Sequence, residues 1–149
     1  MPAATHQTVV LVGLGHTNAH VLLEWAKRPP PNAQLICITD HPHASYSGML
    51  PGVLAGQYEL AEMLIDLPAL CRAAGARLVI SPWESLDRDR REVVCADGTT
   101  IAYDWLSIGI GSRPNLQRVT VAQNAPLLVI KPMQTVVERL AERVTQVQR

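Results

Sequence analysis

Two glycines separated by one residue, Gly13 and Gly15, stand between a short apolar run and a segment of helical pattern. Glycine at the first position permits a tight turn, and glycine at the second lets the backbone approach a pyrophosphate lying on the N-terminus of the helix, where His16 stands. The third position of this dinucleotide-binding fingerprint normally allows close packing of helix on strand, and here it holds Asn18 instead of Gly or Ala. Asn18 therefore makes the match to the fingerprint looser, and it stays among the candidate cofactor-binding residues. The alternative is a glycine turn that binds no ligand.

An acid near the end of the second strand of such a unit holds the ribose hydroxyls of the nucleotide. Asp40 is the candidate, 25 positions after Gly15, with Thr39 at the last position of the strand itself. Three consecutive prolines, residues 29–31, account for the spacing, which is longer than the usual ~20 positions. The alternative is that Asp40 only caps the strand exit.

Histidines and cysteines offer weaker signals. His16 and His20 are four positions apart on one helix, a spacing that suits Zn²⁺, but no third ligand accompanies them, and we interpret them as a residue at the helix start and a surface residue. The three cysteines, each in or beside an apolar run, indicate small buried side chains in a reducing, cytoplasmic setting. They are Cys37, Cys71 and Cys95.

The elements that must position these residues alternate at first. Buried strands are predicted at residues 8–12, 35–38 and 77–80, with helices at 16–28 and 68–74 between them. Three prolines must end the first helix, and Gly75 suits the position after the second. Parallel strands alternating with helices indicate an α/β domain.

The rest of the chain departs from this alternation. Residues 41–58 are too rich in Gly, Pro and Ser for regular structure, so we expect a long loop there. Short strands at 83–87, 92–95 and 100–103 predict an antiparallel meander, with a type I′ turn at Asp97-Gly98 that requires positive φ at both residues. A strand at 105–108 then returns to the sheet, and an amphipathic helix begins at Met133.

Composition bounds the class of protein. A chain of 149 residues, 48% hydrophobic and 17% charged, is one globular domain and excludes a disordered tail. Thirteen basic side chains balance thirteen acidic ones, so no net charge attracts nucleic acid or an anionic membrane. Apolar runs are too short for a transmembrane segment, and a homo-oligomer is compatible with the sequence.

In this order the parts resemble a known family, the pyridine nucleotide–disulfide oxidoreductases. Residues 13–16 look like the FAD fingerprint of the group, the meander stands where the group inserts one, and residues 103–114 (Tyr-Asp-Trp-Leu-Ser-Ile-Gly-Ile-Gly-Ser-Arg-Pro) resemble its second FAD motif. Residues 46–58 (Tyr-Ser-Gly-Met-Leu-Pro-Gly-Val-Leu-Ala-Gly-Gln-Tyr) are similar to the NADH dehydrogenase-like branch, especially the flavoprotein module found fused to selenophosphate synthase.

The resemblance implies a Rossmann-like three-layer FAD/NAD(P)-binding domain, with a parallel sheet, helices and the meander. It implies oxidation of NAD(P)H by bound FAD, with electrons passed to an unknown acceptor. The turn glycines and His16 would hold the pyrophosphate, Thr39 or Asp40 the ribose, and the backbone of Trp83 the adenine. Toward the flavin would lie Met49, Leu50, Pro51 and Gly111. No catalytic acid or base is implied.

The departures from the family also carry expectations. The cysteine pair of the disulfide reductases is missing after the second strand, which disfavours thiol chemistry. Residues 1–131 correspond to the N-terminal part of an FAD domain, and 132–149 to a helix connecting to an NAD(P)-binding half that this sequence lacks. We therefore expect a truncated chain, inactive alone, whose partners are a dinucleotide and the missing half. The rival hypothesis is a non-enzymatic nucleotide-binding or interaction domain.

Overall fold

A computed structural model of the chain describes residues 6–112, 114–115, 117, 120–122, 129–131, 133–136 and 139–140. The chain forms two compact units. The first consists of residues 1–44 and 65–110, and the second of residues 45–64 and 111–149. A two-stranded sheet of β3 (His43–Ser45) and β4 (Leu64–Asp66) lies where the chain passes between the units.

A four-stranded parallel sheet forms the centre of the first unit. Its strand order is β5-β2-β1-β9, and all three pairings are parallel. The four strands are β1 (Gln7–Val12), β2 (Ala33–Thr39), β5 (Arg77–Ile80) and β9 (Trp105–Ile108), as the apolar runs predict. β1 lies inside the sheet because its residues are apolar on both faces, which is typical of parallel strands covered on both sides.

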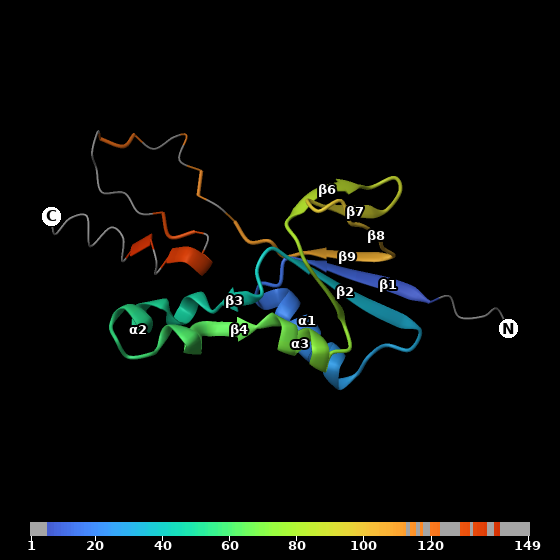
Figure 1. Ribbon diagram of the computed structural model, residues 1–149, viewed down its shortest axis with the longest axis horizontal. Helices are drawn as coiled ribbons and strands as arrows, with labels where there is room; N and C mark the ends of the chain where they lie inside the picture. The colour runs from blue at the N-terminus through green and yellow to red at the C-terminus, as the bar shows by residue number, and fades with distance from the viewer. Residues whose placement is uncertain are drawn as a thin grey trace. The chain divides into compact units, whose positions relative to one another are not determined.

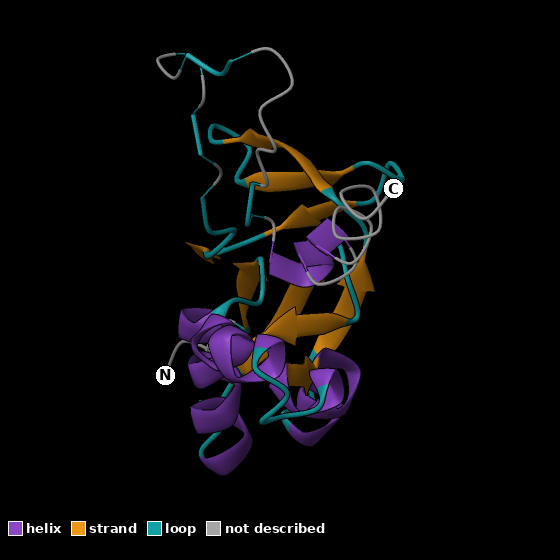
Figure 2. Ribbon diagram, turned by 90° about the vertical axis from the view of Figure 1, so that its left-hand side faces the viewer, coloured by secondary structure: helices purple, strands orange, loops and turns teal. Residues whose placement is uncertain are grey.

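Each face of the sheet packs against a different layer, as Figure 1 shows. On one face, Leu11 and Cys37 pack with Leu22 of helix α1 (His16–Lys27) and with Leu67 of helix α3 (Leu67–Ala73). On the other face, Val10, Val12, Ile36 and Ile38 pack with the meander through Val93, Cys95 and Ile101. The predicted α/β fold with a parallel sheet and an antiparallel meander is confirmed; Figure 2 draws its strands in orange and its helices in purple.

Local signals explain where the two helices begin and end. α1 stops at Lys27, two residues before the three prolines, which cannot continue a helix. α3 begins after Asp66, whose Oδ1 accepts a hydrogen bond from the Ala69 N–H at 2.8 Å. It ends before Gly75, which adopts a φ of +62°. Both helices agree with the sequence-based prediction within one residue.

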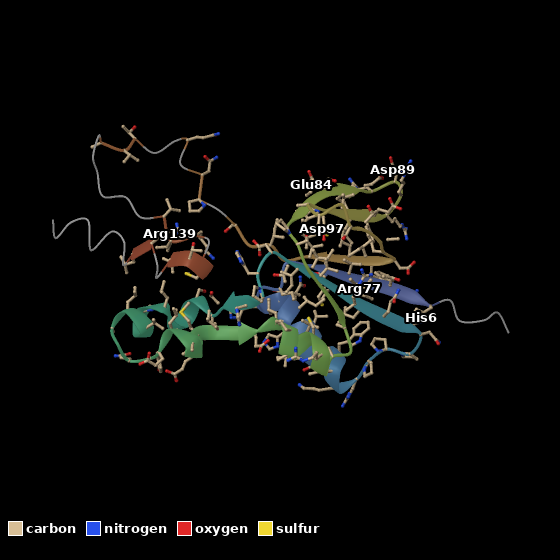
Figure 3. The ribbon with its side chains drawn as sticks, viewed as in Figure 1. His6, Arg77, Glu84, Asp89, Asp97 and Arg139 are labelled. Atoms are coloured by element: carbon tan, nitrogen blue, oxygen red, sulfur yellow. The ribbon has the colours of Figure 1, made fainter. Side chains whose placement is uncertain are left out.

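The meander consists of β6 (Trp83–Asp87), β7 (Glu92–Cys95) and β8 (Thr100–Ala102), paired in that order and antiparallel. The predicted type I′ turn is wrong, because Gly98 has a φ of +83° but Asp97 is not among the residues with positive φ. Instead, the Gly98 N–H donates to the Cys95 carbonyl, closing a turn that is followed by one left-handed residue. Asp97, which is labelled in Figure 3, fixes this turn because its Oδ1 accepts a hydrogen bond from the Thr99 N–H.

The prediction of a loop without regular structure at residues 41–58 is wrong, because the second unit has helical turns in this range. It contains the 3₁₀ turn η1 (Ser47–Met49), helix α2 (Leu50–Leu54) and the 3₁₀ turn η2 (Leu60–Met63). Pro51 fits because it occupies the first turn of α2, where a missing N–H costs nothing. Gly52 fits because a Cβ at this position would clash with the ring of Tyr58. The breaker residues therefore allow close packing here.

The core of this second unit is small. Leu50, Met63 and Val136 are buried together, and Met133 packs against them from the 3₁₀ turn η3 (Met133–Thr135). The predicted amphipathic helix begins at this point, and most of its remaining residues, 137–138 and 141–149, lie outside the described part of the chain.

Candidate dinucleotide-binding site

The carboxyl ends of all four parallel strands lie at one edge of the sheet. Val12 pairs with Ile38 on one side and with Ile108 on the other, and Thr39 pairs with Ile80. The chain proceeds from β1 outward to β2 and β5, and then returns to the opposite side of β1 as β9. Strand order therefore reverses at β1, and ligands of open α/β sheets bind in the crevice at such a point.

Gly13 occupies this reversal point and is held on both sides. Its N–H donates to the Ile38 carbonyl of β2 at 2.8 Å, while the Gly109 N–H donates to the Val12 carbonyl at 2.7 Å. Gly13 has a φ of +75°, and an added Cβ would lie 2.7 Å from the Gly109 carbonyl oxygen. Only glycine satisfies both the left-handed backbone and the close approach of β9.

Asn18 is completely buried beneath this turn. Its Nδ2 donates to the Gly13 carbonyl at 2.6 Å and more weakly to the Val12 carbonyl at 3.4 Å, and its Oδ1 accepts the Ser107 hydroxyl at 2.8 Å. Carbonyls only accept and the hydroxyl can donate, so these partners fix the orientation of the amide. We call the hydrogen bonds of Asn18 with Gly13 and Ser107 the Asn18 bridge.

Asn18 departs from the fingerprint in residue type, yet it packs closely at this position, and its expected role in cofactor binding remains a prediction. A Cβ on Gly109 would lie 2.7 Å from Asn18 Nδ2, so the room for the Asn18 side chain comes from the glycine at the end of β9. The small residue that the fingerprint normally places on the helix is found instead on the neighbouring strand. The packing stays tight because the larger side chain, Asn18 on the helix, lies against a residue without a side chain, Gly109.

The N-terminus of α1 opens at the same edge. Gly15 is the N-cap residue, and its carbonyl accepts the Ala19 N–H at 2.9 Å. Among the described residues no side-chain hydrogen bond caps this end, and no acidic residue lies in the first turn, so the turn itself places no negative charge at the positive end of the helix dipole. Gly15 and His16 are both exposed here.

Thr39 and Asp40 follow at the end of β2, where the Ser81 N–H also donates to the Thr39 carbonyl. The Thr39 side chain is buried, and its hydroxyl donates to the His41 carbonyl at 3.1 Å. Asp40 is exposed, with Oδ2 3.7 Å from His41 Nε2. The structure thus leaves the Asp40 carboxylate on the surface of this edge, while the Thr39 hydroxyl is occupied by backbone.

Trp83 begins β6 only two residues after Ser81. Its indole Nε1 donates to the Ser85 carbonyl at 2.8 Å across a bulge in the β6–β7 pairing, and the ring packs on the meander core. The polar atom of this side chain is therefore used within the protein. The expected contact between the Trp83 backbone and an adenine remains a prediction.

The residues expected toward a flavin fall in the second unit. Leu50 is buried in its small core and Met49 packs against that core, while Pro51 and Gly111 are exposed. Gly111 has a φ of +73°. Their proximity to a flavin remains a prediction.

Other candidate chemistry finds less support. Within the described ranges, no three His, Cys, Asp or Glu side chains form a metal-binding group. Each of the three cysteines is buried and unpaired in a disulfide. A hydrogen bond with Cys71, and then burial, raise the pKa of the Cys37 thiol. In the part of the chain that is described, no helix has the length and apolarity needed to cross a bilayer.

Sequence reasoning missed Ser107 and Gly109 as members of this site. Both lie in a segment that resembles a family motif, but the hydrogen bond between Ser107 and Asn18 joins residues 89 positions apart. A usable signal was present: the polar Asn18 at a position reserved for small residues requires both a hydrogen-bonding partner and extra space, and Ser107 in β9 and Gly109 directly after it offer these.

No protein-family model matches the chain, and no curated protein sequence does. Several solved structures are similar to the chain. A ferredoxin reductase from Rhodopseudomonas palustris is 25% identical, with a TM-score of 0.61, over 76% of this chain and 28% of that one. Putidaredoxin reductase, solved in covalent complex with putidaredoxin, is 24% identical, with a TM-score of 0.62, over 77% and 28%.

The sulfide:quinone oxidoreductase of Aquifex aeolicus is 22% identical, with a TM-score of 0.60, over 68% of this chain and 24% of that one. The chain spans about a quarter of the length of these structures. The reversal point at Gly13, the meander and these similarities agree with one another, and the chain therefore has the fold of the N-terminal part of the pyridine nucleotide–disulfide oxidoreductases.

Proposed function

We propose that this chain is the N-terminal FAD-binding fragment of an NAD(P)H-dependent flavoprotein oxidoreductase, which passes electrons from NAD(P)H through FAD to an acceptor. One observation carries the proposal: the Gly13 turn stands at the reversal point of the parallel sheet, directly before an uncapped helix N-terminus. This combination is the usual site for the pyrophosphate of a dinucleotide.

The polar groups at this edge fit an anion. The carbonyl of Gly13, which would repel a phosphate, already accepts a hydrogen bond from Asn18. The first turn of α1 contains no acid, and Gly15 has no side chain to cover the backbone. The turn thus combines the positive end of the helix dipole with very little competing negative charge, and we assign Gly13, Gly15 and His16 to the pyrophosphate.

For the ribose we favour Asp40 over Thr39. Both lie at the end of β2, beside the Gly13 turn, but the Thr39 hydroxyl is bound to the backbone of His41 and the Asp40 carboxylate is exposed. An exposed carboxylate can accept hydrogen bonds from both ribose hydroxyls. The backbone of Trp83, at the start of β6, is the proposed contact for the adenine.

The flavin itself supplies the electron-transfer chemistry when bound, and the protein orients it. Met49, Leu50, Pro51 and Gly111 are proposed for the flavin side. We further propose that the parent protein combines this chain with an NAD(P)-binding half, that the protein is cytoplasmic, and that this chain alone is inactive.

Titration of the 149-residue chain with FAD and with ADP tests the proposal. We expect both ligands to bind and to compete, because they share the adenosine and pyrophosphate groups. Asp40→Ala should weaken both by about tenfold, equal to about 1.4 kcal/mol. Asp89→Ala is the matched control, since Asp89 is exposed on the β6–β7 turn of the same unit, as labelled in Figure 3.

Three outcomes separate the hypotheses. Binding of FAD and ADP that depends on Asp40 supports the FAD-binding fragment. Binding of ADP without any affinity for the flavin portion would favour the rival, a non-enzymatic nucleotide-binding domain. If neither ligand binds, or if Asp40→Ala and Asp89→Ala bind equally well, the assigned site is wrong.

A further inference from the structure

A buried amide at the third fingerprint position needs an explanation, because that position normally holds a residue with no polar side chain. Asn18 contacts no solvent, and both donors of its amide are used by the backbone at the end of β1. Its side chain is therefore not available to a ligand. Any effect of Asn18 on a bound dinucleotide has to pass through the residues that it holds.

Those residues make up the turn itself. The backbone around Gly13 is tied to β2 through its N–H, to β9 through the Val12 carbonyl and to α1 through the Gly13 carbonyl. The third tie is the only one of these that a side chain makes. It depends in turn on Ser107, whose hydroxyl holds Asn18 Oδ1.

We infer that Asn18 and Ser107 are positioning residues for the pyrophosphate of the proposed dinucleotide, an inference that rests on the proposed function. The Asn18 bridge directs the Gly13 carbonyl inward, toward the buried amide. Without it, the peptide unit between Gly13 and Leu14 is free to rotate, and its carbonyl can turn toward the phosphates. The cost then falls on a ligand that carries phosphate at this place and on no other.

Loss of the Asn18 bridge has a signature that general destabilisation lacks. ADP and FAD carry a pyrophosphate, whereas adenosine carries none. Removing the bridge should therefore weaken ADP and FAD by the same factor and leave adenosine unchanged. A variant that merely loosens the domain would weaken all three ligands together.

The experiment measures the dissociation constants of adenosine, ADP and FAD for the unchanged chain, Ser107→Ala and Ser107→Thr. Ser107→Ala removes the hydroxyl that holds Asn18, and we expect ADP and FAD to bind about tenfold more weakly, equal to about 1.4 kcal/mol. Ser107→Thr keeps a hydroxyl and should restore most of this affinity. Asn18→Ala should match Ser107→Ala or exceed it, and the serine variants keep the test valid if Asn18→Ala does not fold.

Gln34→Ala provides the matched control. Gln34 Nε2 donates to the Thr8 hydroxyl at 2.7 Å, an amide–hydroxyl pair on the same sheet at the amino ends of the strands. The Gln34→Ala variant should leave the ratio of adenosine affinity to ADP affinity unchanged.

The outcomes distinguish failure of the positioning role of Asn18 and Ser107 from failure of the proposed function. If ADP and FAD bind the unchanged chain but Ser107→Ala leaves the adenosine-to-ADP ratio as it was, the inference is overturned and the proposed function stands. If neither ADP nor FAD binds the unchanged chain, the proposed function fails, and the inference fails with it.

Discussion

Replacing Gly109 by Ala should destabilise the first unit through a clash with one identified side chain. The new Cβ would lie 2.7 Å from Asn18 Nδ2 and 3.2 Å from Asn18 Cγ, well inside van der Waals contact. It would also lie 3.3 Å from the Gly13 carbonyl oxygen. The φ of Gly109 is not in the left-handed region, so this cost is steric and not conformational.

The magnitude follows from two contributions. Overpacking of a well-packed interior typically costs about 1–3 kcal/mol. Displacing Asn18 also breaks its hydrogen bond with the Gly13 carbonyl, which adds about 1 kcal/mol. We therefore expect Gly109→Ala to lower the free energy of unfolding by about 3 kcal/mol, a large part of the roughly 5–15 kcal/mol that stabilises a typical domain.

A double-mutant cycle isolates the clash. Urea unfolding, followed by tryptophan fluorescence, is measured for the unchanged chain, Asn18→Ala, Gly109→Ala and the double variant. In the Asn18→Ala background the amide is gone, so adding Gly109→Ala should cost no more than about 1 kcal/mol, from the remaining contact with the Gly13 carbonyl.

Gly75→Ala serves as the control, because Gly75 has a φ of +62° with nothing within 4 Å of an added Cβ. It should cost about 1 kcal/mol in either background, since this strain does not involve Asn18. Equal costs of Gly109→Ala in the two backgrounds would refute the reasoning, as would a neutral Gly109→Ala.

Three further predictions concern thiols, acid and a helix cap. A hydrogen bond with Cys71, and then burial, raise the thiol pKa of Cys37, and burial raises that of Cys95, whereas the hydrogen bond with Cys37 lowers the thiol pKa of Cys71. All three thiols are buried, so we expect Ellman's reagent to find no reactive thiol in the native chain near pH ~8 and three in urea; native reactivity would show that the core opens. Hydrogen bonds from the N–H and hydroxyl of Thr99 hold the pKa of Asp97 below its ordinary 3.8. Because this pKa is lowered by folding, the ionised carboxylate stabilises the hairpin above the unfolded pKa, and this stability is lost as pH falls through the folded pKa; Asp97→Asn should therefore lose less stability than the unchanged chain in urea titrations between about pH 5 and pH 2, and a parallel loss would contradict the assignment. Asp66→Ala removes the cap of α3 and should cost about 1 kcal/mol in the same assay, with Asp66→Asn recovering most of it; an unchanged midpoint for Asp66→Ala would mean that the cap contributes nothing.

Several features of the fold could be predicted because their causes are local. The strands of the parallel sheet are continuous apolar runs, since both of their faces are covered, and such runs are visible in the sequence. The ends of α1 and α3 are set by prolines, a capping Asp and a glycine within a few residues of each end.

Other features could not be predicted, because one local pattern is compatible with two structures. Asp-Gly suits a type I′ turn, but it also suits a longer turn in which only the glycine is left-handed, and pairing of Cys95 with Thr99 selects the second. Gly and Pro in residues 46–58 indicate a loop by composition, yet Pro51 starts a helix and Gly52 makes room for the Tyr58 ring.

The sequence by itself determined that a glycine turn joins a buried strand to a helix, because the required residues are adjacent in the chain. Only the tertiary structure decided what Asn18 does. Its partners Ser107 and Gly109 lie beside it because β9 returns to the free side of β1, and no local pattern specifies that strand order. A buried amide is stable only where hydrogen-bond partners and space coincide, and here both are supplied by a strand 89 residues away.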